Sequence, residues 1–333
     1  MGDPDLHSQS SVIVCMGEIL IDMFPAEVGK KIADVSAFRP KPGGAPANVA
    51  VAAHRLGTPS AFIGKVGEDA FGAHLIDVLR QQGVETRGMR IDPQARTTLA
   101  FIAMPDANTS EYVFYRNPGA DLKIASADLD RDLLAGARAF HFGSLSLVDE
   151  PARSATHEAV RLAHAAGALI SFDVNFRPSL WASPQQALEQ IHAMIPQADL
   201  LKVNEVEIKL LAGQNEDLPA ACAALLAQGP RLIALTLGAR GSFYATAETH
   251  GALPPFPVET VDATGCGDAF IGALLTRLVS AADWRSQLNS AALQKAFRFA
   301  NATGAITALT QGVIPALPTA EQVEKFLNNA STG

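Results

Sequence analysis

The sequence predicts an α/β fold in which a mostly parallel central sheet carries helices on both faces. Short apolar runs, among them Val12–Met16 and Leu232–Leu237, alternate with helical patterns along most of the chain, as in successive βαβ units. These runs are nearly free of alternating polar residues, which is typical of strands buried on both faces. At 333 residues and 48% hydrophobic content, the chain suits one large domain. We therefore predict a three-layer α/β/α sandwich spanning residues 1–333.

Composition and charge argue against several classes of function. The net charge is -8 and the 26 Lys and Arg residues are scattered, so we expect no nucleic-acid partner. The three cysteines (Cys15, Cys222 and Cys266) have no C-x-x-C spacing, which predicts neither a disulfide framework nor a zinc site and favours a reducing cytoplasm. We expect no signal peptide in the polar residues 1–11 and no membrane span in the short apolar runs.

The first third of the chain supplies three predicted strands and two predicted helices of the sandwich. Gly57 and Gly83 each follow a helical pattern, at the position where glycine commonly ends a helix. The predicted strands are Val12–Met16, Ala61–Gly64 and Met89–Ile91, and the predicted helices are Ala47–Leu56 and Ala70–Gln82.

Two regions interrupt this alternation and predict a small separate sheet. Thr97–Met104 and Glu111–Arg116 are extended segments joined by a turn-rich stretch, with no helix between them. Glu18–Phe24 and Lys31–Arg39 are also extended by pattern. We expect these segments to form a β-sheet lid from about residues 18–40 and 96–118.

The alternation then resumes to the end of the chain. The predicted strands are Ala139–Phe142, Leu169–Asp173, Leu200–Val203 and Leu232–Leu237, followed by a hairpin of Ser242–Thr246 and His250–Leu253. The predicted helices are Glu150–Ala166, Pro184–Ile195, Glu205–Leu211, Pro219–Ala227, one from Thr264, one around Leu288–Leu309 and one near Thr319–Leu327. Ligands of such sheets bind past the carboxyl ends of the strands.

The stretch Thr260–Leu275 carries the strongest functional pattern. Gly265 and Gly267 open a predicted apolar helix, and a glycine-rich turn at a helix start gathers N–H groups into an anion site. Asp268 follows at once, and a carboxylate there suits the removal of a proton from a group that attacks phosphorus. The alternative is an ordinary glycine-capped loop in which Asp268 complements the helix dipole.

Polar residues after two other predicted elements fit a polyol. Gly43, Gly44 and Asn48 lie at a predicted helix start. The Asn48 amide suits the binding of vicinal hydroxyls, and the alternative is that it only caps the helix. Asp173, Asn175 and Arg177 follow a strand at alternate positions, and face one way if the backbone stays extended. Together they suit a polyol and its phosphate, with a structural Asp–Arg pair as the alternative.

Two further stretches fit the nucleotide and its metal. Asn204 and Glu207 share a face of a helix start and suit a hydrated Mg²⁺, or a helix cap. Thr236, Gly238 and Gly241 fit the approach of a nucleotide, or a plain hairpin turn. The sequence has neither the P-loop pattern nor a G-x-G-x-x-G after its first strand.

These residues give the chain a family resemblance. Two motifs follow one another along the chain. The first is Gly43-Gly44-x-x-x-Asn48 together with the Gly64–Gly72 stretch, and the second is Asp262-x-Thr264-Gly265-x-Gly267-Asp268. The chain resembles the ribokinase-like (PfkB) carbohydrate kinases from about Val12 to Leu327. Within that family it is most similar to the fructokinases, through residues 114–121, 141–147, 150–154 and 175–181.

The resemblance implies phosphoryl transfer from Mg·ATP to a sugar hydroxyl, most simply that of fructose, in a homodimer. It implies Asp268 as the catalytic base, with an anion hole at Gly265, Cys266 and Gly267 and with Arg177 on the transferred charge. The implied sugar-binding residues are Asp22, Gly43, Gly44, Asn48, Phe101, Tyr115, Arg116, Asn175, Arg177 and Asp268. The implied ATP-binding residues are Lys202, Asn204, Thr236, Gly238, Gly241, Thr264, Gly265, Gly267 and Asn301. Asn204 and Glu207 would hold Mg²⁺ through water, and Asp262 and Thr264 a monovalent cation such as K⁺.

Cys266 departs from the family pattern, as does Ala263. We expect the helix start to activate the Cys266 thiol. Two other functions stay open. A 2-keto-3-deoxygluconate kinase would pair its acidic substrate with Arg177 or Arg116. A non-catalytic sugar or nucleotide sensor would be expected to lack Asp268, a glycine of the anion hole or the Asn204–Glu207 pair, and all of these are present.

Overall fold

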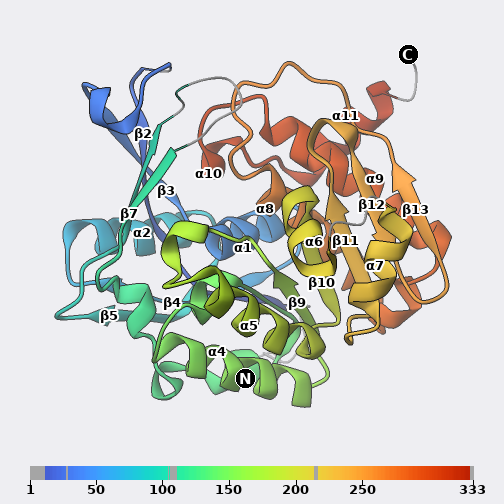
Figure 1. The fold of residues 1–333 in the computed structure, drawn as a ribbon, viewed down its shortest axis with the longest axis horizontal. Coiled ribbons are helices and arrows are strands. Elements are labelled where there is room, and N and C mark those ends of the chain that lie inside the picture. The colour runs from blue at the N-terminus through green and yellow to red at the C-terminus, as the bar shows by residue number, and fades with distance from the viewer. Residues whose placement is uncertain (1–11, 28, 104, 106–110, 214–216, 331–333) are drawn as a thin grey trace, which may run out of the picture.

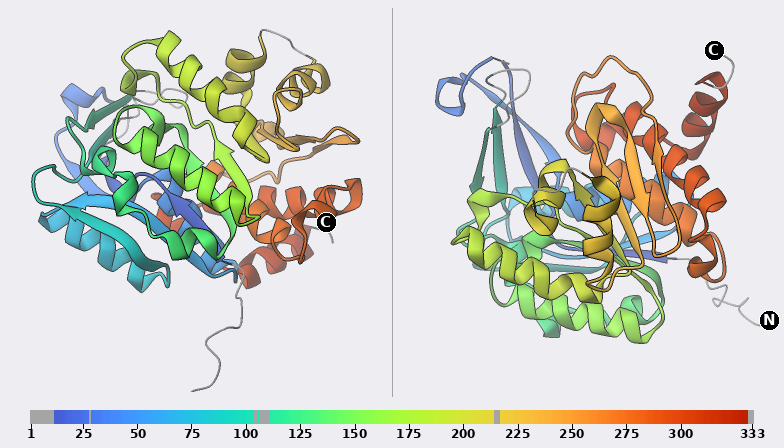
Figure 2. Two further views of the ribbon diagram at one scale, coloured as in Figure 1. Left: turned by 90° about the horizontal axis from the view of Figure 1, so that it is seen from below. Right: turned by 45° about the vertical axis from the view of Figure 1, so that its right-hand side comes forward.

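A nine-stranded sheet runs through the middle of the molecule, with helices on both of its faces (Figures 1 and 2). The structure is a computed structural model that describes residues 12–27, 29–103, 105, 111–213 and 217–330. The strands pair in parallel, as predicted for most of the sheet, except that Ser242–Ala245 pairs antiparallel with both of its neighbours. In spatial order they are β13 (His250–Leu253), β12 (Ser242–Ala245), β11 (Leu232–Thr236), β10 (Leu200–Asn204), β9 (Leu169–Asp173), β8 (Ala137–Gly143), β1 (Val12–Met16), β4 (Ser60–Gly67) and β5 (Glu85–Asp92).

The sheet separates two hydrophobic cores, which is why its inner strands are apolar throughout. Ile13 and Cys15 of β1 point into one core, and Val14 and Met16 point into the other. The first core is covered by α1 (Ala45–Arg55), α2 (Ala70–Gln81), α8 (Cys266–Leu278), α9 (Ser290–Thr307), α10 (Val313–Ala316) and α11 (Ala320–Ala330). The second is covered by α3 (Arg131–Ala135), α4 (Ala152–Ala165), α5 (Pro184–Met194), α6 (Glu205–Ala212) and α7 (Leu218–Leu226).

A second, four-stranded sheet projects from this body, and we call it the lid (Figures 1 and 2). Its order is β3 (Phe38–Gly43), β2 (Leu20–Pro25), β6 (Leu99–Ala103) and β7 (Glu111–Tyr115). The predicted hairpin of β6 and β7 is confirmed. The strand predicted at Lys31–Arg39 is wrong, because Ile32–Asp34 is a 3-10 turn and the strand begins at Phe38. β3 tolerates Pro40 and Pro42 because it is an edge strand.

The remaining differences concern the ends of elements and short turns. α8 begins at Cys266 instead of Thr264, α1 begins at Ala45, and β5 extends well beyond the predicted Met89–Ile91. Further 3-10 turns lie at Ala120–Lys123, Ser126–Asp128, Ser144–Leu147, Pro178–Leu180, Ile195–Gln197, Gly238–Arg240 and Trp284–Gln287. Within the described part of the chain, no helix is both long and apolar enough to span a bilayer.

Candidate active site

The start of α8 is built to receive an anion. Gly265 precedes the helix with a φ of 79°, and a Cβ there would lie 2.2 Å from Val313 Cγ1, so only glycine fits. No side chain caps the helix start. The first N–H groups of α8 and the positive end of its dipole therefore face the site.

Two cavities meet at this helix start. The larger, of about 880 Å³, lies between the lid and the carboxyl ends of the central strands, and the smaller, of about 680 Å³, lies between the β11–β12 turn and α9. Gly267 lines both cavities, Asp268 lines the larger and Cys266 lines the smaller. The other residues that line both are Asn204, Thr236, Thr260 and Ala263. A group bound in one cavity can thus reach a group bound in the other beside the start of α8.

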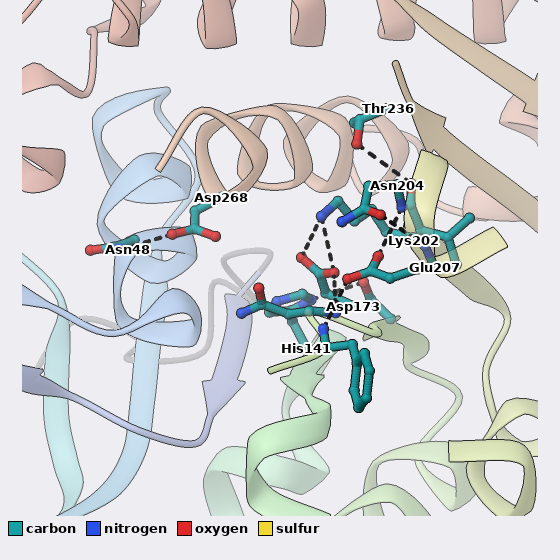
Figure 3. Close-up of polar contacts among 12 residues, drawn as sticks. Asn48, His141, Asp173, Lys202, Asn204, Glu207, Thr236 and Asp268 are labelled. Carbon is teal, nitrogen blue, oxygen red and sulfur yellow. Dashed lines mark hydrogen bonds and ion pairs between the residues drawn. The ribbon is translucent and has the colours of Figure 1, made fainter. Parts of the chain in front are cut away.

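Asp268 is held by a hydrogen bond from α1. Asn48 Nδ2 donates to Asp268 Oδ2 over 2.7 Å (Figure 3). The two helices approach closely at Gly272, where a Cβ would lie 2.7 Å from Ala52 Cβ. Burial raises the pKa of Asp268 to about 6, while the Asn48 hydrogen bond acts in the opposite direction. Asp268 is therefore largely ionised at neutral pH and still a better base than an exposed aspartate.

Asp22 brings a second carboxyl group from β2 to the larger cavity. Burial, followed by the charge of Asp268, raises the pKa of Asp22 to about 7, against the attraction of Arg177. A Cβ on Gly43 would lie 1.9 Å from Asp22 Oδ2, so Gly43 makes room for this carboxyl. Gly44 and Asn48 line the cavity beside it.

The lid wall of the larger cavity uses residues that the sequence did not single out. Tyr112 and Phe114 line the cavity, whereas the predicted Phe101 and Tyr115 do not. Successive side chains of a strand face opposite ways, and Tyr115 is 65% exposed on the outer face of the lid. Phe101 packs edge-on against Tyr115 on that outer face. The alternation along a strand divides its side chains between two faces, but it does not tell which face points into the cavity.

Arg177 reaches the larger cavity from the loop after β9. Its guanidinium lies 5.8 Å from the ring centre of Tyr112, at cation–π distance. The predicted alignment of Asp173, Asn175 and Arg177 is wrong, because Asn175 has a φ of 37° and the backbone turns there. Asn175 and Arg177 line the cavity, and Asp173 is buried beneath it.

Arg116 does not line the larger cavity, contrary to the sugar-binding role expected of it. It is buried at the base of the lid, where Nε donates to Asp121 Oδ2 over 2.7 Å and Nη2 also pairs with that oxygen. Nη2 donates as well to the Leu145 carbonyl over 3.1 Å. The partner, Asp121, lies in a turn that the sequence did not predict.

A buried charged network lies beside Gly267, and Figure 3 shows the side chains of Lys202, Asp173 and His141 in it. Lys202 Nζ donates to Asp173 Oδ1 over 3.1 Å, and a Cβ on Gly267 would lie 3.3 Å from that nitrogen. Burial lowers and Asp173 raises the pKa of Lys202, and the net shift is upward. The neighbouring His141 bonds Ser171 through Nδ1 at 2.9 Å, and burial lowers the pKa of His141 to about 4, so it is neutral.

Asn204 and Glu207 form a capping box at the start of α6. Glu207 accepts N–H groups from Phe176 and Asn204, each over 2.8 Å, through its two oxygens. Both carboxylate oxygens of Glu207 are thus used by this helix cap. Among the described residues, no group of three acidic, histidine or cysteine side chains is arranged to hold a metal ion. The site fits a hydrated Mg²⁺ carried on phosphates and reached through water.

The smaller cavity has apolar walls and a glycine-rich mouth. Gly238 and Gly241 line it from the β11–β12 turn, and a Cβ on Gly241 would lie 2.1 Å from the Leu253 carbonyl oxygen. Asn301 of α9 also lines it, and its Nδ2 donates to the Pro254 carbonyl over 3.1 Å. The apolar walls include Pro255, Phe256, Val258, Phe270 and Ala305.

The structure contradicts one prediction about the start of α8, and the monovalent cation expected at Asp262 and Thr264 stays a prediction. The expected activation of Cys266 is wrong, since burial, followed by the charges of Asp262 and Asp268, raises the pKa of its thiol to about 12. Asp262 accepts N–H groups of Thr264 and Gly312, each over 2.9 Å. This buried carboxylate has no Lys or Arg partner within the described chain, which suits a bound monovalent cation.

Comparisons with known proteins agree with this geometry. The model of the pfkB family of carbohydrate kinases matches residues 10–320. The chain is 43% identical to fructokinase-2 of Solanum lycopersicum over 324 residues, or 97% of this chain and 98% of that protein. Fructokinase of Xylella fastidiosa with bound ATP superposes with a TM-score of 0.89 at 33% identity, covering 97% of this chain and 99% of that one. A double mutant of Vibrio cholerae O395 fructokinase, bound to fructose, ADP and a potassium ion, superposes with a TM-score of 0.85 at 31% identity, covering 96% and 98%. The chain belongs to the pfkB family of carbohydrate kinases.

Proposed function

We propose that this kinase transfers the γ-phosphoryl group of ATP to a hydroxyl of fructose, giving fructose 6-phosphate. The observation that carries this proposal is the position of Asp268, at the uncapped start of α8 where the two cavities meet. The sugar would occupy the larger cavity and the nucleotide the smaller. The attacking hydroxyl and the γ-phosphoryl group then come together beside Asp268.

Asp268 serves as the general base in this scheme. Because the transition state of phosphoryl transfer is loose, the base orients the hydroxyl and accepts its proton as the phosphoryl group moves. The N–H groups of Gly265, Cys266 and Gly267 stabilise the transferred charge, together with the dipole of α8. Arg177 supplies a further positive charge from the sugar side.

The nucleoside contacts follow the walls of the smaller cavity, and the phosphate contacts lie where that cavity opens into the larger one. We assign the ATP phosphates to Thr264, Lys202 and Asn204, and the nucleoside to Thr236, Gly238, Gly241 and Asn301. Mg²⁺ supplies positive charge to the phosphates when bound, and Asn204 is the protein group that would approach its water shell. Asp262 and Thr264 would hold K⁺. Turnover measured with and without K⁺ tests this assignment.

Fructose is favoured over 2-keto-3-deoxygluconate by the charge of the larger cavity. Its walls carry the carboxyl groups of Asp22 and Asp268, which repel an acidic sugar. Of the two cations among the described residues that line it, Lys202 is paired with Asp173, so only Arg177 is left to attract such a sugar. Arg116, one of the two arginines that could have paired with such a substrate, is bound to Asp121. A neutral polyol instead donates hydroxyl hydrogens to these carboxyl groups.

The experiment is an ADP-release assay over fructose, 2-keto-3-deoxygluconate, ribose and tagatose. The highest kcat/KM is expected for fructose. A higher value for 2-keto-3-deoxygluconate would contradict the assignment of the larger cavity. ATP binding without turnover on any of the four sugars would favour the sensor function.

We also propose that the protein is a cytoplasmic homodimer joined through the outer face of the lid. That face carries apolar side chains, among them Phe38, Phe101, Val113 and Tyr115, and the last two are 44% and 65% exposed. Burying such a face against a second copy would remove its apolar side chains from water. All three cysteines are free thiols, which suits a reducing compartment.

A further inference from the structure

Four chain segments connect the lid to the body, and one buried charged cluster includes or contacts all of them. Glu18 enters β2 and Ala45 follows β3, and Glu18 Oε1 accepts the Ala45 N–H over 3.1 Å. Thr98 enters β6 and Arg116 leaves β7, and both bind Asp121: Thr98 Oγ1 donates to Oδ1 over 2.6 Å, and Arg116 Nε donates to Oδ2. The cluster therefore lies where the lid can bend relative to the body.

Arg116 attaches the cluster to the body of the molecule, and its charge attracts Glu18 on the other side of the cluster. Arg116 Nη2 donates to the carbonyl of Leu145, which follows β8. The Arg116 charge attracts Glu18, opposing the effect of burial, which raises the pKa of Glu18 to about 7. Glu18 Oε2 and Arg116 Nη1 are both buried and have no hydrogen-bond partner among the described residues. An acceptor on the Glu18 side of the cluster and a donor of opposite charge on the Arg116 side therefore stay unpaired.

The sequence accommodates this cluster with glycine. A Cβ on Gly119 would lie 2.1 Å from Thr98 Oγ1 and 2.5 Å from Asp121 Oδ1. A Cβ on Gly44 would lie 2.5 Å from the Glu18 carbonyl oxygen. Glu18, Arg116 and Asp121 are each at least nine-tenths buried. Because buried ion pairs add little net stability, a role in fixing one geometry explains the cluster better.

We propose that Glu18, Arg116 and Asp121 form the hinge that sets the angle of the lid over the sugar cavity. Glu18 and Arg116 are then positioning residues, since they act on the sugar through the Tyr112 and Phe114 wall of the lid. The lid angle also decides how well water is excluded from the γ-phosphoryl group. None of the three hinge residues lines the smaller cavity, so the hinge is expected to act on the sugar side and not on ATP binding.

The test compares Glu18→Gln, Thr98→Val and the double variant, all nearly isosteric. Glu27→Gln is the control for the first, because Glu27 is a carboxylate between β2 and β3 whose partners among the described residues are Ser36 and Lys30. Thr156→Val is the control for the second, because Thr156 is a buried threonine that bonds Ala152 within α4. Both hinge variants should raise the KM for fructose about tenfold, as expected for one lost hydrogen bond to a charged group. They should also raise the rate of ATP hydrolysis measured without sugar and leave the KM for ATP unchanged. The effect of the double variant on the KM for fructose, expressed as a free energy, should differ from the sum of the two single effects.

Amide exchange of β6 and β7 is measured beside the kinetics, because the kinetic readout rests on the proposed sugar kinase activity. Both hinge variants should speed this exchange without substrate, and neither control should. A higher KM in Glu18→Gln alone, with unchanged exchange in both hinge variants, would mean that Glu18 contacts the sugar directly and would overturn the hinge. A wild-type protein inactive on every sugar would refute the proposed function, while the exchange data would still decide the hinge.

Discussion

Asp268 and Asn48 make the contact on which the proposed chemistry depends. A general base at this position needs a pKa low enough to be ionised at neutral pH and high enough to accept a proton. Burial raises the pKa of Asp268 to about 6, and the donated hydrogen bond from Asn48 limits that rise. Asn48 therefore holds the carboxylate in place and sets its basicity.

Replacing Asn48 with Ala should move the acid limb of the pH–rate profile to higher pH. The Asn48 hydrogen bond stabilises the ionised carboxylate and lowers its pKa, so its loss raises the pKa of Asp268 above about 6. Activity that falls as the pH drops should then begin to fall at a higher pH. The measurement is kcat/KM for fructose from mildly acidic to mildly alkaline pH. An acid limb identical to that of the wild type would argue against Asp268 as the titrating base.

Cys266 should behave as an inert thiol. Burial raises the pKa of Cys266 to about 12, so at neutral pH its alkylation by iodoacetamide should be at least about a hundredfold slower than that of free cysteine. Cys266→Ala should keep kcat within about twofold, because the anion hole uses backbone N–H groups. The unfolded protein provides the labelling control. Rapid labelling that ATP prevents would instead indicate an activated thiol.

Sequence reasoning found the polar residues around α8 but misjudged residues whose orientation depends on tertiary contacts. Asp268, Asn48, Asp22 and Arg177 all line the larger cavity. Arg116 was misjudged because the pairing with Asp121 depends on a turn that no local pattern marks. Phe101 and Tyr115 were misjudged because period-2 alternation does not say which face of a strand is inward.

The start of α8 depends on backbone geometry more than on side chains. Gly265 should be intolerant of alanine for two reasons, its left-handed φ of 79° and the 2.2 Å approach of Val313 Cγ1. Gly167→Ala is a matched control, because Gly167 has a φ of 82° and nothing within 4 Å of an added Cβ.

Thermal or urea unfolding separates these two contributions. Gly167→Ala should lower the free energy of unfolding by about 1–2 kcal/mol, the cost of left-handed backbone. Gly265→Ala should lower it by about 2–5 kcal/mol, since overpacking is added, and should abolish turnover. Equal losses in the two variants would show that Val313 does not constrain the turn.

The central strands were predictable and the edge strands were not, for a physical reason. Strands such as β1 and β11 are buried on both faces and read as apolar runs. β5 is an edge strand with several exposed residues, and β3 is an edge strand with two prolines, so neither shows that pattern. The pairing of β2 with β6 joins distant segments, which local sequence does not encode.

The molecule as a whole places the two cavities, which we assign to the sugar and the nucleotide, on either side of one helix start, and the lid beside the larger cavity has an apolar outer face. If that face joins two copies, light scattering should give the mass of a dimer. Val113→Asp puts a charge on it and should give a monomer, whereas a change at the exposed Arg39 of β3 to Gln should not. A monomeric wild type would rule out this interface.

Asp268 is the proposed base for phosphoryl transfer between the two cavities. This role is tested most directly by the turnover of Asp268→Asn on fructose, with the binding of ATP and fructose measured separately by calorimetry. We predict that kcat falls by about 10²–10⁴-fold, while both ligands bind with nearly unchanged affinity. Near-normal turnover in this variant would contradict this role.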